Sequence, residues 1–258
     1  MQKQELPRFV WFELHTPDAA ASSWFYSKVF GWAADDVSSL GRPYLTLRSG
    51  NDAVAGILPK SIAAFEADKT HPRWMGYIQV SDVQIYVARV KQAGGQVRRA
   101  IQEIPGLGRF AVVGDPENAA FVIYQPLFQG SDVNLRDVGA IRFRWHDLIC
   151  TNGSSQLKFY SSVFGWTKLG DSRTDASTKC QSFAIDGVPV GGMMHPRTSD
   201  QEHGWVFNVD VMDMKTAIGR AVEAGGALIH EPFEIADGRR VAQCVDAQGI
   251  AFGMVASS

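Results

Sequence analysis

A nine-residue pattern of apolar and polar positions occurs twice along the chain and predicts the same helix in both places. The first copy is WFYSKVFGW (24–32), and the second is KFYSSVFGW (158–166), 134 residues later. In each copy apolar side chains recur at positions i, i+4 and i+5, which places them along one side of a helix. The glycine that follows can adopt the left-handed conformation that ends a helix. The repeat therefore predicts a duplicated fold in which these residues form core.

Alternating patterns predict the strand that precedes each helix. In FVWFELHT (9–16) the odd positions share one face of a strand and the even positions share the other. The triplet Thr16-Pro17-Asp18 predicts a helix start, with Thr16 as the capping residue and proline in the first turn. The strand recurs at 143–150, where Trp145 stands at the place of Trp11 and Asp147 at the place of Glu13.

The other patterns complete four units that each read as a strand, a helix and three strands. A polar loop is expected at 59–72, between the first unit and the second. The helices of the second and fourth units are expected to begin at Asp82 and Asp213 and to end at paired glycines. The remaining expected strands are 44–49, 53–58, 74–80, 96–103, 109–113, 121–125, 181–185 and 189–194.

The predicted fold class is α+β, with four βαβββ modules paired into two domains that have cupped mixed sheets. The first domain is predicted at 1–126 and the second at 142–258. The polar run GSDVNLRD lies between them and predicts a linker at 127–141.

Composition narrows the function classes. The net charge of −2 over 258 residues predicts no large basic surface, so neither nucleic acid nor an anionic membrane is an expected partner. The three cysteines are far apart and form no CxxC pair, so we expect neither a disulfide framework nor a zinc knuckle. No apolar run approaches the roughly 18 residues of a membrane span. These features favour a cytoplasmic protein.

Several spaced motifs resemble those of the vicinal oxygen chelate superfamily, which includes glyoxalase I, bleomycin-resistance proteins and extradiol dioxygenases. The motifs are FYSKVFGW and FYSSVFGW, the AGG helix ends, and DPENAAFVIY with its counterpart DAQGIAFGMV. The resemblance covers nearly the whole chain and implies paired βαβββ units that curl around a cavity. In most enzymes of the superfamily that cavity holds one divalent metal ion bound by His, Glu or Gln.

The positions that correspond to these ligands carry other residues in this chain. The resemblance implies ligands at one site on the first strand and one on the last strand of each unit. The corresponding residues are Trp11, Met75, Trp145, Val206, Ile57, Val122, Met193 and Gly253. A divalent ion needs three or four imidazole or oxygen ligands, so we predict no metal site and no cofactor. The alternative is a metal site displaced along the strand that uses Glu13 and His15.

These positions instead predict apolar cavity walls with a few polar groups. Glu13 and Asp147 are the candidate catalytic residues, because an acid that faces an apolar cavity has a raised pKa and suits acid–base chemistry. Each acid could equally hydrogen-bond a neighbouring strand and only order the fold. The other predicted ligand-binding residues are Trp11, His15, Met75, Tyr77, Gln79, Val122, Tyr124, Trp145, Met193, His195, Val206, Asn208 and Asp210.

Three function classes remain open at this point. The first is a lyase- or isomerase-like enzyme of the superfamily that works without metal through Glu13 or Asp147. The second is a protein that sequesters an apolar or aromatic compound, and the third is a regulatory protein in which the cavities are relics. The expected partner is a small-molecule ligand, and the chain is expected to be a monomer or a homodimer.

Overall fold

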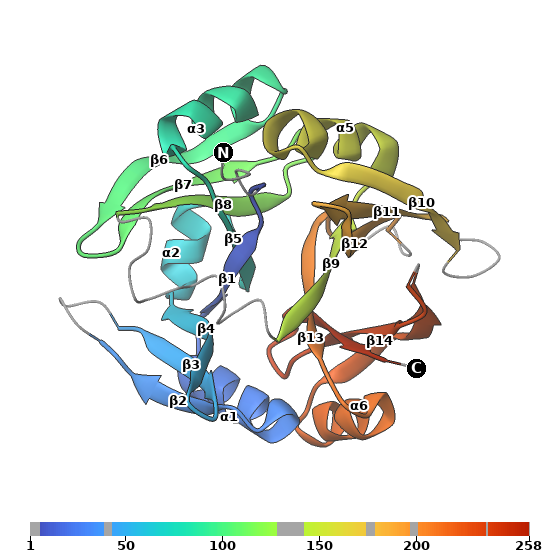
Figure 1. Ribbon diagram of the computed structural model, residues 1–258. Helices are drawn as coiled ribbons and strands as arrows, with labels where there is room; N and C mark the ends of the chain where they lie inside the picture. The colour runs from blue at the N-terminus through green and yellow to red at the C-terminus, as the bar shows by residue number, and fades with distance from the viewer. Residues whose placement is uncertain are drawn as a thin grey trace.

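Two eight-stranded mixed sheets, A and B, form the framework, and each is built from one half of the chain (Figure 1). The computed structural model describes residues 6–38, 43–127, 142–173, 179–196, 201–235 and 237–257. The elements of the first half are β1 (Phe9–Thr16), α1 (Ala19–Phe30), β2 (Ala33–Asp36), β3 (Leu45–Ser49), β4 (Asp52–Pro59), α2 (Ile62–Ala67), β5 (Arg73–Gln79), α3 (Val83–Gln92), β6 (Gln96–Ile104), β7 (Gly108–Gly114) and β8 (Ala120–Pro126). Those of the second half are β9 (Phe143–Ile149), α5 (Gly153–Phe164), β10 (Thr167–Arg173), β11 (Lys179–Ile185), β12 (Val188–Met194), β13 (Gly204–Asp210), α6 (Met214–Glu223), β14 (Ala227–Glu234), β15 (Arg240–Val245) and β16 (Ala251–Ala256).

The strand order is the same in both sheets and confirms the predicted α+β fold. Sheet A runs β2-β3-β4-β1-β5-β8-β7-β6, and sheet B runs β10-β11-β12-β9-β13-β16-β15-β14. The first strand of each half pairs in parallel with the last strand of its own βαβββ module, and antiparallel with the first strand of the next module. The predicted linker falls almost wholly on 128–141, outside the described residues, so the domain boundaries stay predictions.

The duplicated helices begin and end through their own side chains and glycines. The cap of α1 is Asp18, whose Oδ1 accepts a hydrogen bond from the backbone N–H of Ala21 at 2.9 Å. The expectation that Thr16 is the cap is therefore wrong; its hydroxyl instead accepts from the N–H of Asp18. Gly31 and Gly165 end the repeated helices with φ values of 70° and 77°, as the sequence predicted.

Three elements were not anticipated from the sequence. The strands β2 and β10 each follow a duplicated helix and form an edge of their sheet. Strand β2 reads AADD, and all four residues are exposed, so no apolar alternation marks it. The helix α2 lies within the segment expected to be a loop, and its cap is Ser61. Figure 1 shows sheet A curving around α2.

The two sheets share one hydrophobic core, which lies between their facing sides. Phe12 of β1 stacks on Phe143 of the second half with ring centroids 4.2 Å apart, and Phe207 packs edge-on against it at 4.9 Å. Helix α1 lies beside α6, and α3 lies beside α5, at the two ends of this core (Figure 1). We call this side of each sheet the core face, and the opposite side the concave face.

Two buried triads cross between the halves inside this core. The Tyr26 hydroxyl donates to Asp246 Oδ2 at 3.1 Å and accepts from the indole N–H of Trp74 at 3.0 Å. The second triad repeats the arrangement with Tyr160, Asp115 and Trp205 at 3.0 and 3.1 Å. In both triads the tyrosine and the tryptophan come from one half and the aspartate comes from the other.

The described part of the chain contains no helix that is both long and apolar enough to cross a membrane.

Candidate functional site

The concave face of sheet A carries a cluster of polar side chains on β1. Trp11, Glu13 and His15 point to this face, as the alternation predicted, whereas Phe12 and Leu14 enter the core. Phe9 was expected beside Trp11 and lies in the core instead. The pairing of β1 with β5 shifts register between Phe9 and Trp11, and a bulge of this kind moves a side chain to the other face.

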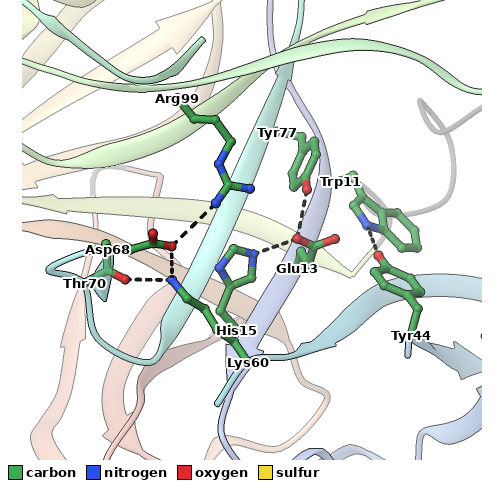
Figure 2. A network of polar contacts seen from close by, with 9 residues as sticks. All are labelled: Trp11, Glu13, His15, Tyr44, Lys60, Asp68, Thr70, Tyr77 and Arg99. Atoms are coloured by element: carbon green, nitrogen blue, oxygen red, sulfur yellow. Dashed lines mark hydrogen bonds and ion pairs between the residues drawn. The ribbon is translucent and has the colours of Figure 1, made fainter. Parts of the chain in front are cut away.

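Glu13 is the centre of this cluster (Figure 2). Its Oε1 lies 2.7 Å from His15 Nε2 and accepts the Tyr77 hydroxyl at 2.9 Å. Tyr44 also hydrogen-bonds the carboxylate, and its hydroxyl accepts the indole N–H of Trp11 at 3.1 Å. The buried carboxylate therefore has partners from three strand regions, as a buried charge requires.

These partners reverse the expected protonation behaviour of Glu13. Burial by itself disfavours the carboxylate, but the hydrogen bond and charge of His15, with the hydroxyls of Tyr77 and Tyr44, outweigh it and lower the pKa of Glu13. The raised pKa expected from the sequence is wrong for this residue. Glu13 is therefore ionised at neutral pH and is suited to accept hydrogen bonds rather than to donate a proton.

An ionised Glu13 fixes the orientation of His15. A carboxylate only accepts hydrogen bonds, so His15 Nε2 carries the proton and donates it to Glu13. No described residue bonds Nδ1, and the His15 side chain is 21% exposed. When the imidazole is neutral, the lone pair of Nδ1 has no described partner and can accept a proton from a bound molecule, as a general base does.

The concave face of sheet B carries the equivalent acid in a closed environment. Asp147 Oδ1 accepts the indole N–H of Trp145 at 2.8 Å, and its Oδ2 accepts the amide of Asn208 at 3.0 Å. Gln243 also bonds the carboxyl group. All four side chains are buried, whereas His15 and Tyr77 of sheet A are partly exposed. The surroundings of the two acids therefore differ in access, because two neighbours of Glu13 are partly exposed whereas the neighbours of Asp147 are buried.

Burial raises the pKa of Asp147 to about 6, in spite of the bonds from Asn208, Trp145 and Gln243. For this acid the raised pKa expected from the sequence is confirmed. A carboxyl group with a raised pKa in the folded state stabilises the fold below its unfolded pKa, near 3.9, and loses that contribution as the pH rises through about 6. Ionisation of Asp147 thus destabilises the protein at neutral pH.

Asp147→Asn is expected to remove this pH dependence. The amide stays neutral, so the unfolding free energy of the variant relative to wild type should rise by about 2–3 kcal/mol between pH 4 and pH 7.5. Urea unfolding at several pH values measures it, with exposed Asp52→Asn as the control. A difference that stays constant across this range would contradict the assignment.

The other predicted ligand-binding residues lie on sheet A, on sheet B, or outside both concave faces. Four lie on the concave face of sheet A, where Met75 and Val122 pack together, Tyr77 bonds Glu13, and the Tyr124 hydroxyl donates to the Leu107 carbonyl at 2.8 Å. Gln79 lies at the end of β5 in register with Tyr124. Trp145, Val206 and Asn208 lie on the concave face of sheet B, and Asp210 lies at the end of β13, where its Oδ2 is 3.6 Å from Arg144.

Met193 and His195 are not part of these faces. Parallel pairing sets Gly192 beside Asp147 and Met193 beside Leu148, so Met193 enters the core and Met194 takes the concave position. The same one-residue shift applies in the first half, where Ile57 pairs with Leu14 in the core. His195 follows the end of β12 and is exposed.

Tyr44 was not recognised as a site residue from the sequence. It precedes β3, and its hydroxyl reaches Glu13 across Gly56 of β4. A Cβ at Gly56 would lie 1.9 Å from the Tyr44 hydroxyl oxygen, so only glycine leaves room for it. An isolated glycine within a strand often marks such a close approach, and this was the available signal.

The donors on the concave faces do not fit a divalent metal ion. In the described ranges, no three or more His, Cys, Asp or Glu side chains lie close enough together to hold an ion. Glu13 and His15 provide two ligands, and the remaining neighbours of Glu13 are tyrosine hydroxyls. On sheet B a Cβ at Gly253 would lie 1.8 Å from Asn208 Oδ1, so an amide fills the last-strand position there. A bound ion would need at least one further strong ligand.

Paired βαβββ modules and polar groups on the concave sheet face define a protein of the glyoxalase fold class. The chain belongs to the glyoxalase/bleomycin resistance protein/dioxygenase superfamily, whose family model matches residues 8–123. It is 30% identical to "Putative glyoxylase CFP32" of Mycobacterium tuberculosis (strain CDC 1551 / Oshkosh), over 95% of this chain and 93% of the relative. It is also 30% identical to "Anthracycline biosynthesis protein DauV" of Streptomyces sp. (strain C5), over 95% of this chain and 91% of the relative.

Solved structures of the superfamily share the fold across the whole chain. The Mn(II)-bound glyoxalase from Novosphingobium aromaticivorans superposes with a TM-score of 0.65 at 13% identity, over 98% of this chain and 82% of that one. The 2,2',3-trihydroxybiphenyl 1,2-dioxygenase from Sphingomonas wittichii strain RW1 superposes with a TM-score of 0.67 at 10% identity, over 98% and 91%. At these identities the likeness concerns the fold alone.

Proposed function

We propose that the chain is a small-molecule enzyme in which His15, oriented by Glu13, removes a proton from a ligand bound on the concave face of sheet A. The observation that carries this proposal is the 2.7 Å contact between His15 Nε2 and a buried, ionised carboxylate, with Nδ1 left without a protein partner in the described chain. Proton abstraction of this kind suits a lyase- or isomerase-like reaction.

The surroundings of His15 support a planar aromatic ligand. Trp11, Tyr77, Phe110 and Tyr124 line the same face, and aromatic walls with a few convergent polar groups are typical of small-molecule sites. One group of relatives is named for anthracycline biosynthesis, which agrees with an aromatic ligand class. Neither support depends on a metal ion, since the donor set on this face does not fit one.

A thermal-shift screen of aromatic hydroxy and carbonyl compounds tests the proposal. A ligand at one hundred times its dissociation constant should stabilise the protein by about 2.7 kcal/mol. His15→Trp fills the proposed site and should abolish that shift, whereas His195→Trp, at an exposed histidine of the second half, should retain it. The melting temperature of each variant without ligand shows whether the substitution itself perturbs the fold.

The same screen separates catalysis from sequestration. Each compound that shifts the melting temperature is incubated with the protein and analysed for conversion by mass spectrometry. Conversion supports the enzyme, whereas tight binding without conversion would favour a ligand-sequestering protein. A shift that survives His15→Trp would place the ligand elsewhere and contradict the proposed site.

A further inference from the structure

Helix α2 and the residues around it place two cations at the edge of the proposed ligand site. The helix lies between β4 and β5, inside the curve of sheet A (Figure 1). In the second half, the connection between β12 and β13 is shorter than the one between β4 and β5. Any role of the α2 segment therefore belongs to the half that carries His15.

Asp68, at the end of α2, bridges the two cations (Figure 2). Its Oδ2 lies 2.8 Å from Lys60 Nζ and 3.5 Å from a guanidinium nitrogen of Arg99. Lys60 Nζ also donates to the Thr70 hydroxyl at 2.9 Å and lies 4.6 Å from the centre of the Phe65 ring. The Lys60 side chain is only 15% exposed, while Asp68 is 45% exposed. The lysine is thus held in place, and its carboxylate partner is the accessible member of the pair.

Both cations belong to the same face as His15. The backbone N–H of Lys60 donates to the carbonyl of Thr16 at 2.9 Å, directly beside His15 in the chain. Arg99 of β6 pairs with Val112 of β7, and Val112 pairs with Val122 of β8. Val122 in turn pairs with Tyr77 of β5, so Arg99 and Tyr77 lie in one row across the sheet. Burial raises the pKa of Tyr77, and the neighbouring Glu13 and Tyr44 raise it further. The positive charge of Arg99 is close enough to lower this pKa in part. Lys60 and Arg99 therefore lie beside the Glu13–His15–Tyr77 cluster on the same sheet face.

A largely buried lysine needs a negatively charged or hydrogen-bonding partner, because desolvation of an unpaired ammonium is unfavourable. Asp68 supplies this partner now, but from an exposed position where the interaction is weak and screened by salt. A ligand carboxylate that takes the place of Asp68 keeps Lys60 and Arg99 paired. The aromatic part of such a ligand would lie on the sheet face that also carries Tyr77 and His15.

We propose that Lys60 and Arg99 form an anion subsite for the carboxylate of an aromatic acid, and that Asp68 occupies this subsite when no ligand is bound. This inference rests on the proposed function, since it concerns a ligand on the same sheet face. It adds that this ligand carries a negative charge. The Asp68 carboxylate is a competitor for the subsite, so its removal strengthens the binding of an aromatic anion.

The test compares 2-naphthoate with the neutral 2-naphthamide by isothermal titration calorimetry on the full chain. The wild-type protein is expected to bind the acid more tightly than the amide. Asp68→Asn should tighten binding of 2-naphthoate by up to about fivefold, because an exposed pair of this kind contributes up to about 1 kcal/mol. Binding of 2-naphthamide should not change. Glu66→Gln removes the same charge from an exposed position of the same helix and serves as the matched control.

Lys60→Met and Arg99→Met should each reduce the affinity for 2-naphthoate toward that for 2-naphthamide. One outcome would overturn the anion subsite and leave the aromatic site intact. In that outcome both probes bind with equal affinity to wild type and to Asp68→Asn, and His15→Trp abolishes the binding. Binding of 2-naphthoate that His15→Trp does not weaken would place the anion elsewhere and also overturn it. Failure of both probes to bind would contradict the aromatic ligand class and the subsite with it.

Discussion

Replacing His15 with glutamine is expected to lower the turnover of a substrate found in the screen by about two to four orders of magnitude. General acid–base catalysis by one positioned side chain contributes rate factors of this size. Glutamine can still donate its amide N–H to Glu13, so the buried carboxylate keeps a partner at the place of His15 Nε2. The variant loses the proton-accepting Nδ1, and the loss should therefore appear in kcat, measured by steady-state kinetics.

Two variants separate this role from a structural one. Glu13→Gln keeps an oxygen that accepts from His15 Nε2 but removes the charge that favours this tautomer, so an intermediate loss in kcat is expected. His195→Gln changes an exposed histidine and should leave turnover unaltered. If His15→Gln retains wild-type turnover while folded, His15 is not the base.

The Phe12→Ala variant is expected to destabilise both halves of the chain together, by about 3–5 kcal/mol. Truncation of a fully buried phenylalanine costs the transfer free energy of the ring and leaves a cavity. Three of the rings that lose contact, Phe143, His146 and Phe207, belong to the second half. Since the two sheets share this core, urea unfolding should remain a single transition with a lower midpoint.

Hydrogen exchange monitored by mass spectrometry resolves the effect by segment. Faster exchange is expected in strands of both sheets, including β8 and β16. Trp24→Ala is the control, because this side chain is 53% exposed on α1 and its loss should change stability by no more than about 0.5 kcal/mol. Destabilisation limited to sheet A would show that the halves fold independently.

The duplicated framework was accessible from the sequence because its determinants are local. The FYS-x-VFGW repeats carry the apolar side of each helix and the glycine that ends it, and both glycines adopt positive φ. The edge strand β2 was missed because an exposed AADD segment carries no alternation, and its pairing with β3 alone defines it. Helix α2 was missed because a six-residue helix in a polar segment has too little periodicity to be recognised.

The candidate site was only partly predictable, because its chemistry depends on pairing between strands. Alternation along β1 placed Glu13 and His15 on one face correctly. The sign of the pKa shift at Glu13 depends on Tyr77 and Tyr44, which come from other strands, so burial alone gave the wrong direction. Met193 was misplaced by one residue, because the register of β12 against β9 is set by pairing that the sequence pattern does not specify.

The crossed triads set different constraints on different parts of this duplicated protein. Tyr26 hydrogen-bonds an aspartate that lies 220 positions away, and Tyr160 bonds one that lies 45 positions away. A substitution of a triad residue in one half therefore leaves a hydrogen-bonding group of the other half without its partner. The interior positions of the two halves are thus constrained together. The concave faces can differ without disturbing this shared interior, as the partly exposed Glu13–His15 pair of one sheet and the enclosed Asp147 of the other illustrate.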